Sequence, residues 1–382
     1  MFQKHFVIKL SFSLAWPKLR WLASVVKMPT QTSPSVNCCN TIMSESPLSR
    51  PPICPSVDFR LTFIGSRDIR AYDTPPATPT QMDSFAHQLV KEIRSIYSSL
   101  QALSGLKPSP QVDTLLTRLV EICTASHSEA LASYLLSLQG VDGLFAALRV
   151  LCAAAEGELE KYWTLRILDT SRQSSSAQPK PSWKSTKTLL ASFPYYQNYV
   201  DLSRLEFSSL EAFLPACSTS CRPSPCKLAF IGSGPLPLTS LCVLERYQEA
   251  IVHNVDRDAD AVRDSRDLAR ALGLEDRMTW ACEDVGGTQR MTNWKDYQVI
   301  FLAALVGMDS QSKVEILAKI AKEAVPGTLV VVRSARGLRG VLYPVLELED
   351  GVKDAGYEIL AVVHPWTKVV NSIVILKVKS QI

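Results

Sequence analysis

From residue 227 onward, short apolar runs alternate with stretches of helical periodicity. The runs are KLAFIGSG, EAIVHNVD, RMTWACED, YQVIFLAAL, GTLVVVRSA, YEILAVVHP and NSIVILKVK. Continuous apolar strands separated by helices predict a mostly parallel sheet that is covered on both faces. Only HPWTKVV separates the last two runs, so we expect an antiparallel hairpin at the end of a seven-stranded sheet. This α/β layout is typical of the Rossmann-like sheet of S-adenosylmethionine-dependent methyltransferases, whereas a dinucleotide dehydrogenase ordinarily ends differently.

The segment before the sheet is predicted to be all helical. In DSFAHQLVKEIRSIYSSLQAL, apolar residues from Phe85 to Leu100 recur at three- and four-residue steps, the spacing of an amphipathic helix. VDTLLTRLVEICTA and VDGLFAALRVLCAAAEGELEKYWTLRIL predict two further helices. We therefore expect a helical N-terminal domain over residues 83–215 and a Rossmann-like S-adenosylmethionine-binding domain over residues 216–382.

Residues 1–82 have a different composition. No acidic residue occurs from Met1 to Ser44, where lysines, arginines and serines are frequent, and residues 44–80 are rich in proline. We predict a disordered or targeting extension here. A disordered extension is favoured over a mitochondrial transit peptide, so we expect a cytoplasmic location, with a mitochondrial one as the alternative.

Composition excludes several classes of partner. A net charge of +4 on 382 residues does not indicate binding to nucleic acid. No stretch approaches the ~20 apolar residues of a membrane-spanning helix. The ten cysteines include no metal-type pair, and Cys217, Cys221 and Cys226 have no histidine nearby. These patterns predict reduced thiols and no metal site, and they leave the oligomeric state open.

The glycine turn after the first strand run distinguishes two kinds of nucleotide. Gly232, Ser233 and Gly234 would let backbone approach a ligand at the carboxyl edge of the sheet. The third glycine of a dinucleotide motif is missing, and Pro235 and Pro237 remove N–H donors that a pyrophosphate would need. The turn favours S-adenosylmethionine over NAD, the alternative being a plain strand–helix turn.

Further candidates follow the other strands. Asp256 ends the second run, where a carboxylate can accept both ribose hydroxyls; capping of the next helix, by Asp258 for instance, is the alternative. Asp284 ends the third run, where adenine is often read, unless it is a loop residue. Ala303 lies in a small-residue segment suited to a flat ligand or to a buried strand. Arg333 ends the fifth run and suits a substrate carboxylate or an ion pair within the fold.

Two features of the helical segment are candidates for chemistry. Glu156 and Glu160 in AAAEGELEKYW lie one helical turn apart and share a face. Their ordinary interpretation is a solvated helix end. The segment FPYYQNYVDL carries Tyr195, Tyr196 and Tyr199 and is too aromatic for a free loop, so it is alternatively a core plug between the two domains.

Six strings together resemble the nicotianamine synthase family. They are EGELE, FPYYQNYVDLSRLE, LAFIGSGPLPLTS, VIFLAALVGM, VVRSARGLRGVLYP and HPWTKVVNSIVI, and the resemblance runs from about Leu100 to Val378. It implies condensation of three S-adenosylmethionine molecules by 3-amino-3-carboxypropyl transfer, azetidine ring closure, and release of methylthioadenosine. It implies no cofactor beyond this substrate, and a product that chelates metal.

The resemblance also implies site roles. It assigns catalysis to a glutamate and to tyrosines at Glu156, Glu160, Tyr195 and Tyr199, of which we favour Glu156 with Tyr195. Arg333 would hold an aminocarboxylate, and Tyr343 would line the same pocket. Two departures are the long spacer RQSSSAQPKPSWKSTK and Arg336, which replaces a histidine of the family motif. A small-molecule methyltransferase is the alternative enzyme, and a non-catalytic binding protein is a further one.

Overall fold

The computed structural model describes residues 79–174, 183–214, 225–288 and 291–380. The predicted extension over 1–82 lies outside the described residues except for its last four, which open the first helix. Cys217 and Cys221 also lie outside them. The domain boundaries at residues 83, 215 and 216 therefore stay a prediction.

Six helices come before the sheet in the described part of the chain. They are α1 (Pro79–Gln101), α2 (Pro110–Thr124), α3 (Glu129–Ser137), α4 (Val141–Ser174), α5 (Trp183–Leu190) and α6 (Tyr196–Glu211). The three helices predicted from apolar spacing correspond to α1, α2 and α4. Ser109 and Ser128 cap α2 and α3, since each side chain accepts a hydrogen bond from a backbone N–H in the first helical turn.

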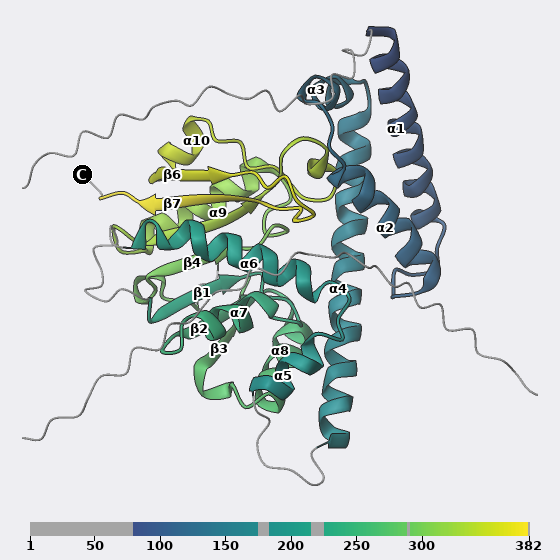
Figure 1. Ribbon diagram of the computed structural model, residues 1–382. Coiled ribbons are helices and arrows are strands. Elements are labelled where there is room, and N and C mark those ends of the chain that lie inside the picture. Colours follow the sequence, from purple (N-terminus) through teal and green to yellow (C-terminus); the bar gives the residue numbers. More distant parts are fainter. Residues whose placement is uncertain (1–78, 175–182, 215–224, 289–290, 381–382) are drawn as a thin grey trace, which may run out of the picture. The chain divides into compact units, whose positions relative to one another are not determined.

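The sheet has the predicted seven strands (Figure 1). They are β1 (Lys227–Ile231), β2 (Ile251–Asp256), β3 (Met278–Cys282), β4 (Val299–Leu302), β5 (Leu329–Ser334), β6 (Tyr357–Val363) and β7 (Ser372–Val378). Their order is β3-β2-β1-β4-β5-β7-β6. β1 to β5 pair in parallel, and β7 pairs antiparallel with both β5 and β6. The mostly parallel sheet and its terminal hairpin are confirmed.

Helices cover both faces of the sheet. The helices among the strands are α7 (Leu238–Arg246), α8 (Ala259–Ala271), α9 (Ser310–Glu323) and α10 (Asp350–Asp354), with short 3₁₀ turns η2 (Glu275–Arg277), η3 (Trp294–Asp296) and η4 (Gly337–Val341). Buried side chains of α6, α7 and α8 form one core with alternate residues of the strands. Those of α9 and α10 form a second core with the remaining strand residues. This alternation follows from the two-residue period of a strand.

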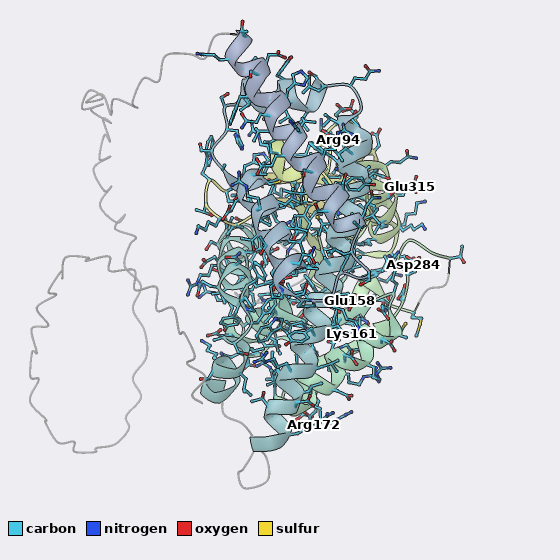
Figure 2. The ribbon with its side chains drawn as sticks, turned by 90° about the vertical axis from the view of Figure 1, so that its right-hand side faces the viewer. Arg94, Glu158, Lys161, Arg172, Asp284 and Glu315 are labelled. Carbon is cyan, nitrogen blue, oxygen red and sulfur yellow. The ribbon has the colours of Figure 1, made fainter. Side chains whose placement is uncertain are left out.

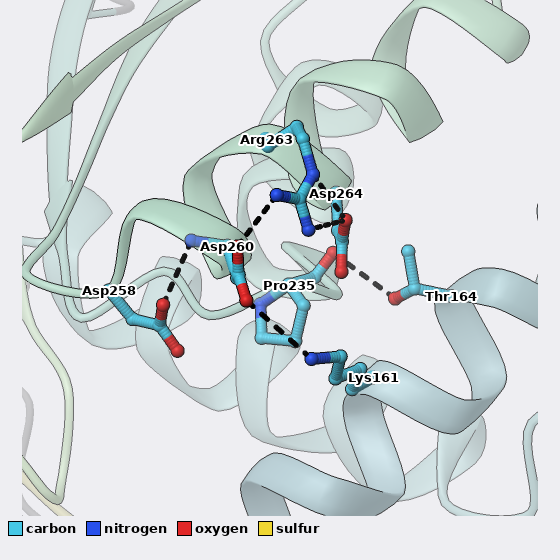
Figure 3. A network of polar contacts seen from close by, with 7 residues as sticks. All are labelled: Lys161, Thr164, Pro235, Asp258, Asp260, Arg263 and Asp264. Carbon is cyan, nitrogen blue, oxygen red and sulfur yellow. Dashed lines mark hydrogen bonds and ion pairs between the residues drawn. The ribbon is translucent and has the colours of Figure 1, made fainter.

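A third core joins the helical segment to the sheet. It is formed by α1–α4 together with Leu338, Val341 and Leu342, which belong to or directly follow η4 after β5. The second half of α4 continues to α8 and to the glycine turn (Figure 3). There the Thr164 hydroxyl donates to the Pro235 carbonyl at 3.1 Å, and the Lys161 ammonium lies 3.9 Å from the Asp260 carboxylate. α4 is therefore held against the carboxyl edge of the sheet.

Within the described residues, no single helix has the length and apolar character needed to cross a membrane. Only α3 and most of α4, taken as a pair bent by 98°, meet that test by length and composition.

Candidate active site

A cavity of about 680 Å³ lies between α4 and the carboxyl ends of the parallel strands. Its wall includes every site residue predicted from the sequence. These are Glu156, Glu160, Tyr195, Tyr199, Gly232, Ser233, Gly234, Pro235, Asp256, Asp284, Ala303, Arg333 and Tyr343. The carboxyl edge of an open parallel sheet is where such folds bind ligands. Glu156 and Tyr343, which are 187 positions apart in the sequence, thus line the same cavity.

The two glutamates of α4 form the polar centre of this chamber. The Tyr199 hydroxyl lies 3.2 Å from Oε1 of Glu156 and 2.8 Å from Oε1 of Glu160. The Tyr343 hydroxyl donates to Oε2 of Glu156 at 3.1 Å. Tyr199 has a single proton, so it donates to one carboxylate and can accept from the other only if that group is protonated. The arrangement suits a glutamate pair that holds one proton between its members.

The surroundings of the pair strengthen this conclusion. Burial raises the pKa of Glu156, and the hydroxyls of Tyr343 and Tyr199 oppose the shift. Burial also raises the pKa of Glu160 well above its usual range, and the neighbouring Glu156 carboxylate adds to the effect. Two like charges in a desolvated site ionise with difficulty. The pair is therefore a better proton acceptor near neutral pH than an exposed glutamate would be.

Glu158 lies between these two residues in sequence but is not part of the cavity wall. Figure 2 labels it on α4 together with Lys161 and Arg172. The solvated helix end that we considered as the ordinary interpretation thus fits Glu158 and not its two neighbours. Helical spacing explains the difference, since residues four apart share a face and a residue two away does not.

The structure places Tyr199, and not the favoured Tyr195, against the glutamates. Tyr195 precedes α6, lines the cavity and packs edge-on against Phe193, with ring centroids 5.9 Å apart. Phe193 is buried and also packs against Tyr199 and Trp163. The aromatic segment is thus both a core plug and a cavity wall. Because α6 begins at Tyr196, Tyr199 lies in the first turn of this helix, and its side chain faces α4.

The glycine turn needs its glycines for two reasons. Gly232 and Gly234 have φ values of 78° and 64°, in the left-handed region that favours glycine. A Cβ on Gly234 would also overlap Oε2 of Glu160, so the backbone of the turn lies directly against the glutamate pair. The two prolines are accommodated because α7 begins only after Pro237. Neither proline therefore removes a hydrogen bond from the helix.

The nucleoside side of the cavity is formed by the ends of β2, β3 and β4. Asp256 accepts hydrogen bonds from Gly234 N at 2.9 Å and from Asp258 N at 3.0 Å. Asp258 caps the N-terminus of α8, so the capping role considered as the alternative for Asp256 is filled by Asp258. Asp284 accepts from Gly286 N at 3.0 Å, and Ala303 lies directly after β4.

Arg333 makes the ion pair within the fold that we considered as its alternative role. Its Nε and Nη2 donate to the two carboxylate oxygens of Glu206 at 2.7 and 2.9 Å, and Nη2 also donates to the Thr239 hydroxyl at 2.6 Å. Glu206 is fully buried and Arg333 is 6% exposed. Only Nη1 of this guanidinium could meet a substrate carboxylate without breaking these contacts.

Three buried charged residues near the cavity were not identified from the sequence. Glu206 lies in the segment YVDLSRLE, where its four-residue distance from Leu202 places it on the buried face of α6. Glu283 is 5% exposed and lines the cavity, and its Oε1 has no hydrogen-bond partner among the described residues. Lys313 is fully buried in α9. The only sequence signal for these residues was a charged side chain within an amphipathic segment. Most charged side chains in such segments are exposed, so this signal did not predict their burial.

Lys313 supports the floor of the cavity. Its Nζ donates to the carbonyls of Ala303 at 3.3 Å, Ala304 at 2.7 Å and Val306 at 2.7 Å, which carry the wall between β4 and α9. Burial lowers the pKa of Lys313 to about 7, although the nearby Asp309 carboxylate opposes the shift. In the unfolded chain Lys313 has the usual lysine pKa of about 10.5. Between about pH 7 and 10.5 the Lys313 amine is therefore protonated in the unfolded chain and neutral in the folded chain.

We expect the folded chain to become more stable, relative to a Lys313→Met variant, as pH rises above 7. Between pH 7 and 9 the free energy of unfolding of the unaltered chain should rise by roughly 1–3 kcal/mol relative to that of Lys313→Met. Urea unfolding at several pH values measures it. Lys322→Met, which removes an exposed lysine of the same helix, is the matched control and should show a constant difference. A pH-independent difference for Lys313→Met as well would contradict the shifted pKa.

Comparison with known proteins identifies the family of this chain. The family model described as nicotianamine synthase protein matches residues 82–382. Nicotianamine synthase 3 of Oryza sativa subsp. indica is 38% identical over 292 residues, which cover 76% of this chain and 78% of the relative. Nicotianamine synthase 2 of Arabidopsis thaliana is 36% identical over 292 residues, covering 76% of this chain and 83% of the relative.

A solved structure shows the same fold. A mutant of MtNAS in complex with S-adenosylmethionine is 22% identical, with a TM-score of 0.58 over 76% of this chain and 98% of that chain. The family model spans the helical segment and the whole sheet, and the plant relatives match across both. This chain therefore belongs to the nicotianamine synthase family.

Proposed function

We propose that this protein is a nicotianamine synthase that uses S-adenosylmethionine as both donor and acceptor of a 3-amino-3-carboxypropyl group. The observation that carries the proposal is the glutamate pair of α4, which Tyr199 and Tyr343 hold against the glycine turn. A donor seated on that turn would present its sulfonium-activated carbon beside the carboxylates. Family relatives bear the nicotianamine synthase name, and MtNAS has been solved with S-adenosylmethionine and with MTA.

Each condensation forms one C–N bond and breaks one C–S bond. The acceptor's α-amino group is an ammonium in water and must lose a proton before its lone pair can attack. In the proposed step the amine nitrogen attacks carbon γ of the donor, the C–S electrons pass to sulfur, and methylthioadenosine leaves. The proton passes to Glu156 or Glu160. The same carboxylates attract the ammonium during binding, so they both gather and activate the acceptor.

Arg333 serves this site indirectly in our proposal. Its charge lowers the pKa values of both Glu156 and Glu160. This effect opposes burial and keeps the pair from binding its proton too tightly to exchange it with an amine. Glu206 and Thr239 hold the guanidinium in place. We therefore assign Arg333 mainly the role of adjusting the pKa values of the glutamate pair. In addition, its Nη1 is the atom that would contact a substrate carboxylate.

The assigned nucleoside contacts complete the proposal. Asp256 would accept the ribose hydroxyls, Asp284 would accept from the adenine amino group, and Ala303 would leave room for the purine. The product of these condensations carries several amines and carboxylates, which are ligands for transition metals. We therefore also propose a role in metal homeostasis. We propose a cytoplasmic location separately, because the composition of residues 1–82 favours a disordered extension over a transit peptide.

Incubating the purified chain with S-adenosylmethionine alone tests this function. We expect methylthioadenosine and products in which one or more aminocarboxypropyl units have been added through new C–N bonds, identified by mass. Release of S-adenosylhomocysteine instead would support the alternative, a small-molecule methyltransferase. Formation of neither nucleoside would reject both enzymatic functions.

A further inference from the structure

The loop between β6 and β7, residues 364–371, also lines the cavity. It belongs to the string HPWTKVVNSIVI, to which the proposed chemistry assigns no residue. Lys368, Val369, Val370 and Asn371 are part of the cavity wall. Val369 belongs to the buried core that includes residues of α6 and α7, and Val370 packs against the helical core of α1–α4. The loop is thus fixed on both sides where it meets the chamber.

Two polar groups of this loop have no partner within the described part of the chain. Asn371 is 7% exposed, and its Nδ2 donor is buried without a hydrogen bond. Lys368 also makes no hydrogen bond or ion pair there, but it is exposed, so its ammonium is solvated at the edge of a cavity whose wall is rich in carboxylates. A buried donor without an acceptor costs roughly 1–3 kcal/mol. An unpaired amide and an unpaired ammonium on one cavity wall are together suited to an anionic ligand.

The other cations of the wall are already used or lie elsewhere. Among the described lining residues, the positively charged ones are Arg257, Arg333 and Lys368. Arg333 is committed to Glu206, and Arg257 follows β2 on the nucleoside side. Every acceptor in the proposed reaction carries at least one α-carboxylate, which Glu156 and Glu160 repel. Lys368 is the wall cation without an ion pair among the described residues, and together with Nη1 of Arg333 it is available to bind such a carboxylate.

The position of the loop favours the acceptor over the donor. Asn371 directly precedes β7, in which Ser372 pairs with Ser334 and Ile373 pairs with Arg333. Asp256 ends β2, and the order β2-β1-β4-β5-β7 places four strand spacings between the two positions. At about 4.8 Å each, that is roughly 19 Å across the sheet. The amine attacks carbon γ from the side opposite sulfur, so the acceptor lies farther from the ribose than the reacting carbon does. Asn371, far from Asp256 across the sheet, therefore lies on the acceptor's side of the cavity.

We propose that Lys368 and Asn371 form a subsite that binds the carboxylate of the amine acceptor. The Lys368 ammonium supplies the charge, and the Asn371 amide supplies a directed donor. The glutamate pair would then bind the acceptor's ammonium while this subsite binds its carboxylate, so that the nitrogen is oriented toward the donor. The inference rests on the proposed function, since it concerns the acceptor of that reaction.

The test compares variants in two separate measurements. The first is the rate of methylthioadenosine release as S-adenosylmethionine concentration is varied. The second is equilibrium binding of methylthioadenosine, which has a nucleoside but no carboxylate. For Lys368→Met and Asn371→Asp we expect the half-saturating concentration of S-adenosylmethionine to rise about tenfold or more. The maximal rate of Lys368→Met should change less than about threefold, and methylthioadenosine affinity should stay within about twofold for both variants.

Two further variants separate charge in the subsite from general effects. Lys368→Arg keeps the charge and should recover most of the loss, and Lys322→Met removes an exposed lysine outside the cavity wall and should behave as the unaltered chain. Kinetics unchanged in both Lys368→Met and Asn371→Asp would overturn the proposal, as would an equal loss of methylthioadenosine affinity. Failure of the proposed function is distinct, because the unaltered chain itself would then form no C–N bond.

Discussion

A chain carrying Glu156→Gln and Glu160→Gln together should release methylthioadenosine at least 100-fold more slowly than the unaltered chain. Glutamine keeps the size of glutamate and can accept a hydrogen bond from Tyr199 or Tyr343. It cannot accept the proton of the amine, and a positioned general base contributes roughly 10²–10⁴ in rate. Binding of the donor S-adenosylmethionine should be largely retained, because the assigned nucleoside contacts lie at the ends of β2, β3 and β4.

Glu158→Gln is the matched control for this result. It changes the same residue type on the same helix, two positions from each member of the pair, but outside the cavity wall. Its turnover should match that of the unaltered chain. The two single variants are also informative, since in our proposal the pair shares a proton and either glutamate alone would serve as a partial base. Unchanged turnover in the double variant would reject the carboxylates as proton acceptors.

The second large effect concerns folding. Glu206→Gln should lower the free energy of unfolding by about 3–5 kcal/mol, because it leaves the Arg333 guanidinium buried without a countercharge. Removing one partner of a buried ion pair is costly even where the intact pair adds little. The midpoint of urea unfolding measures the loss. Activity should fall as well, since Arg333 lies beside the cavity.

The same helix provides the control. Glu211 of α6 makes a comparable two-point contact, accepting from Arg246 Nε and Nη2 at 2.8 Å each, but these side chains are 31% and 56% exposed. Exposed pairs contribute about 0–1 kcal/mol, so Glu211→Gln should be nearly neutral. Equal losses in the two variants would show that burial does not set the contribution of the Arg333 pair.

The fold was largely predictable because its signals are local. A strand buried on both faces needs a continuous apolar run, and a surface helix needs apolar residues at three- and four-residue steps. These requirements identified the strands of the sheet, the closing hairpin, and α1, α2 and α4. They were weaker for α3, which spans Glu129–Ser137, and for α5, where a short helix offers little periodicity.

The amino-acid sequence by itself determined the sheet, the glycine turn and the helical pair Glu156 and Glu160, because each depends on residues within a few positions of one another. The tertiary structure decided which side chains meet them. Tyr343 reaches Glu156 across 187 positions, and Arg333 reaches Glu206 across 127. The choice of Tyr199 over Tyr195 depends on where α6 begins relative to α4. Such pairings follow from the packing of distant elements, which no local period encodes.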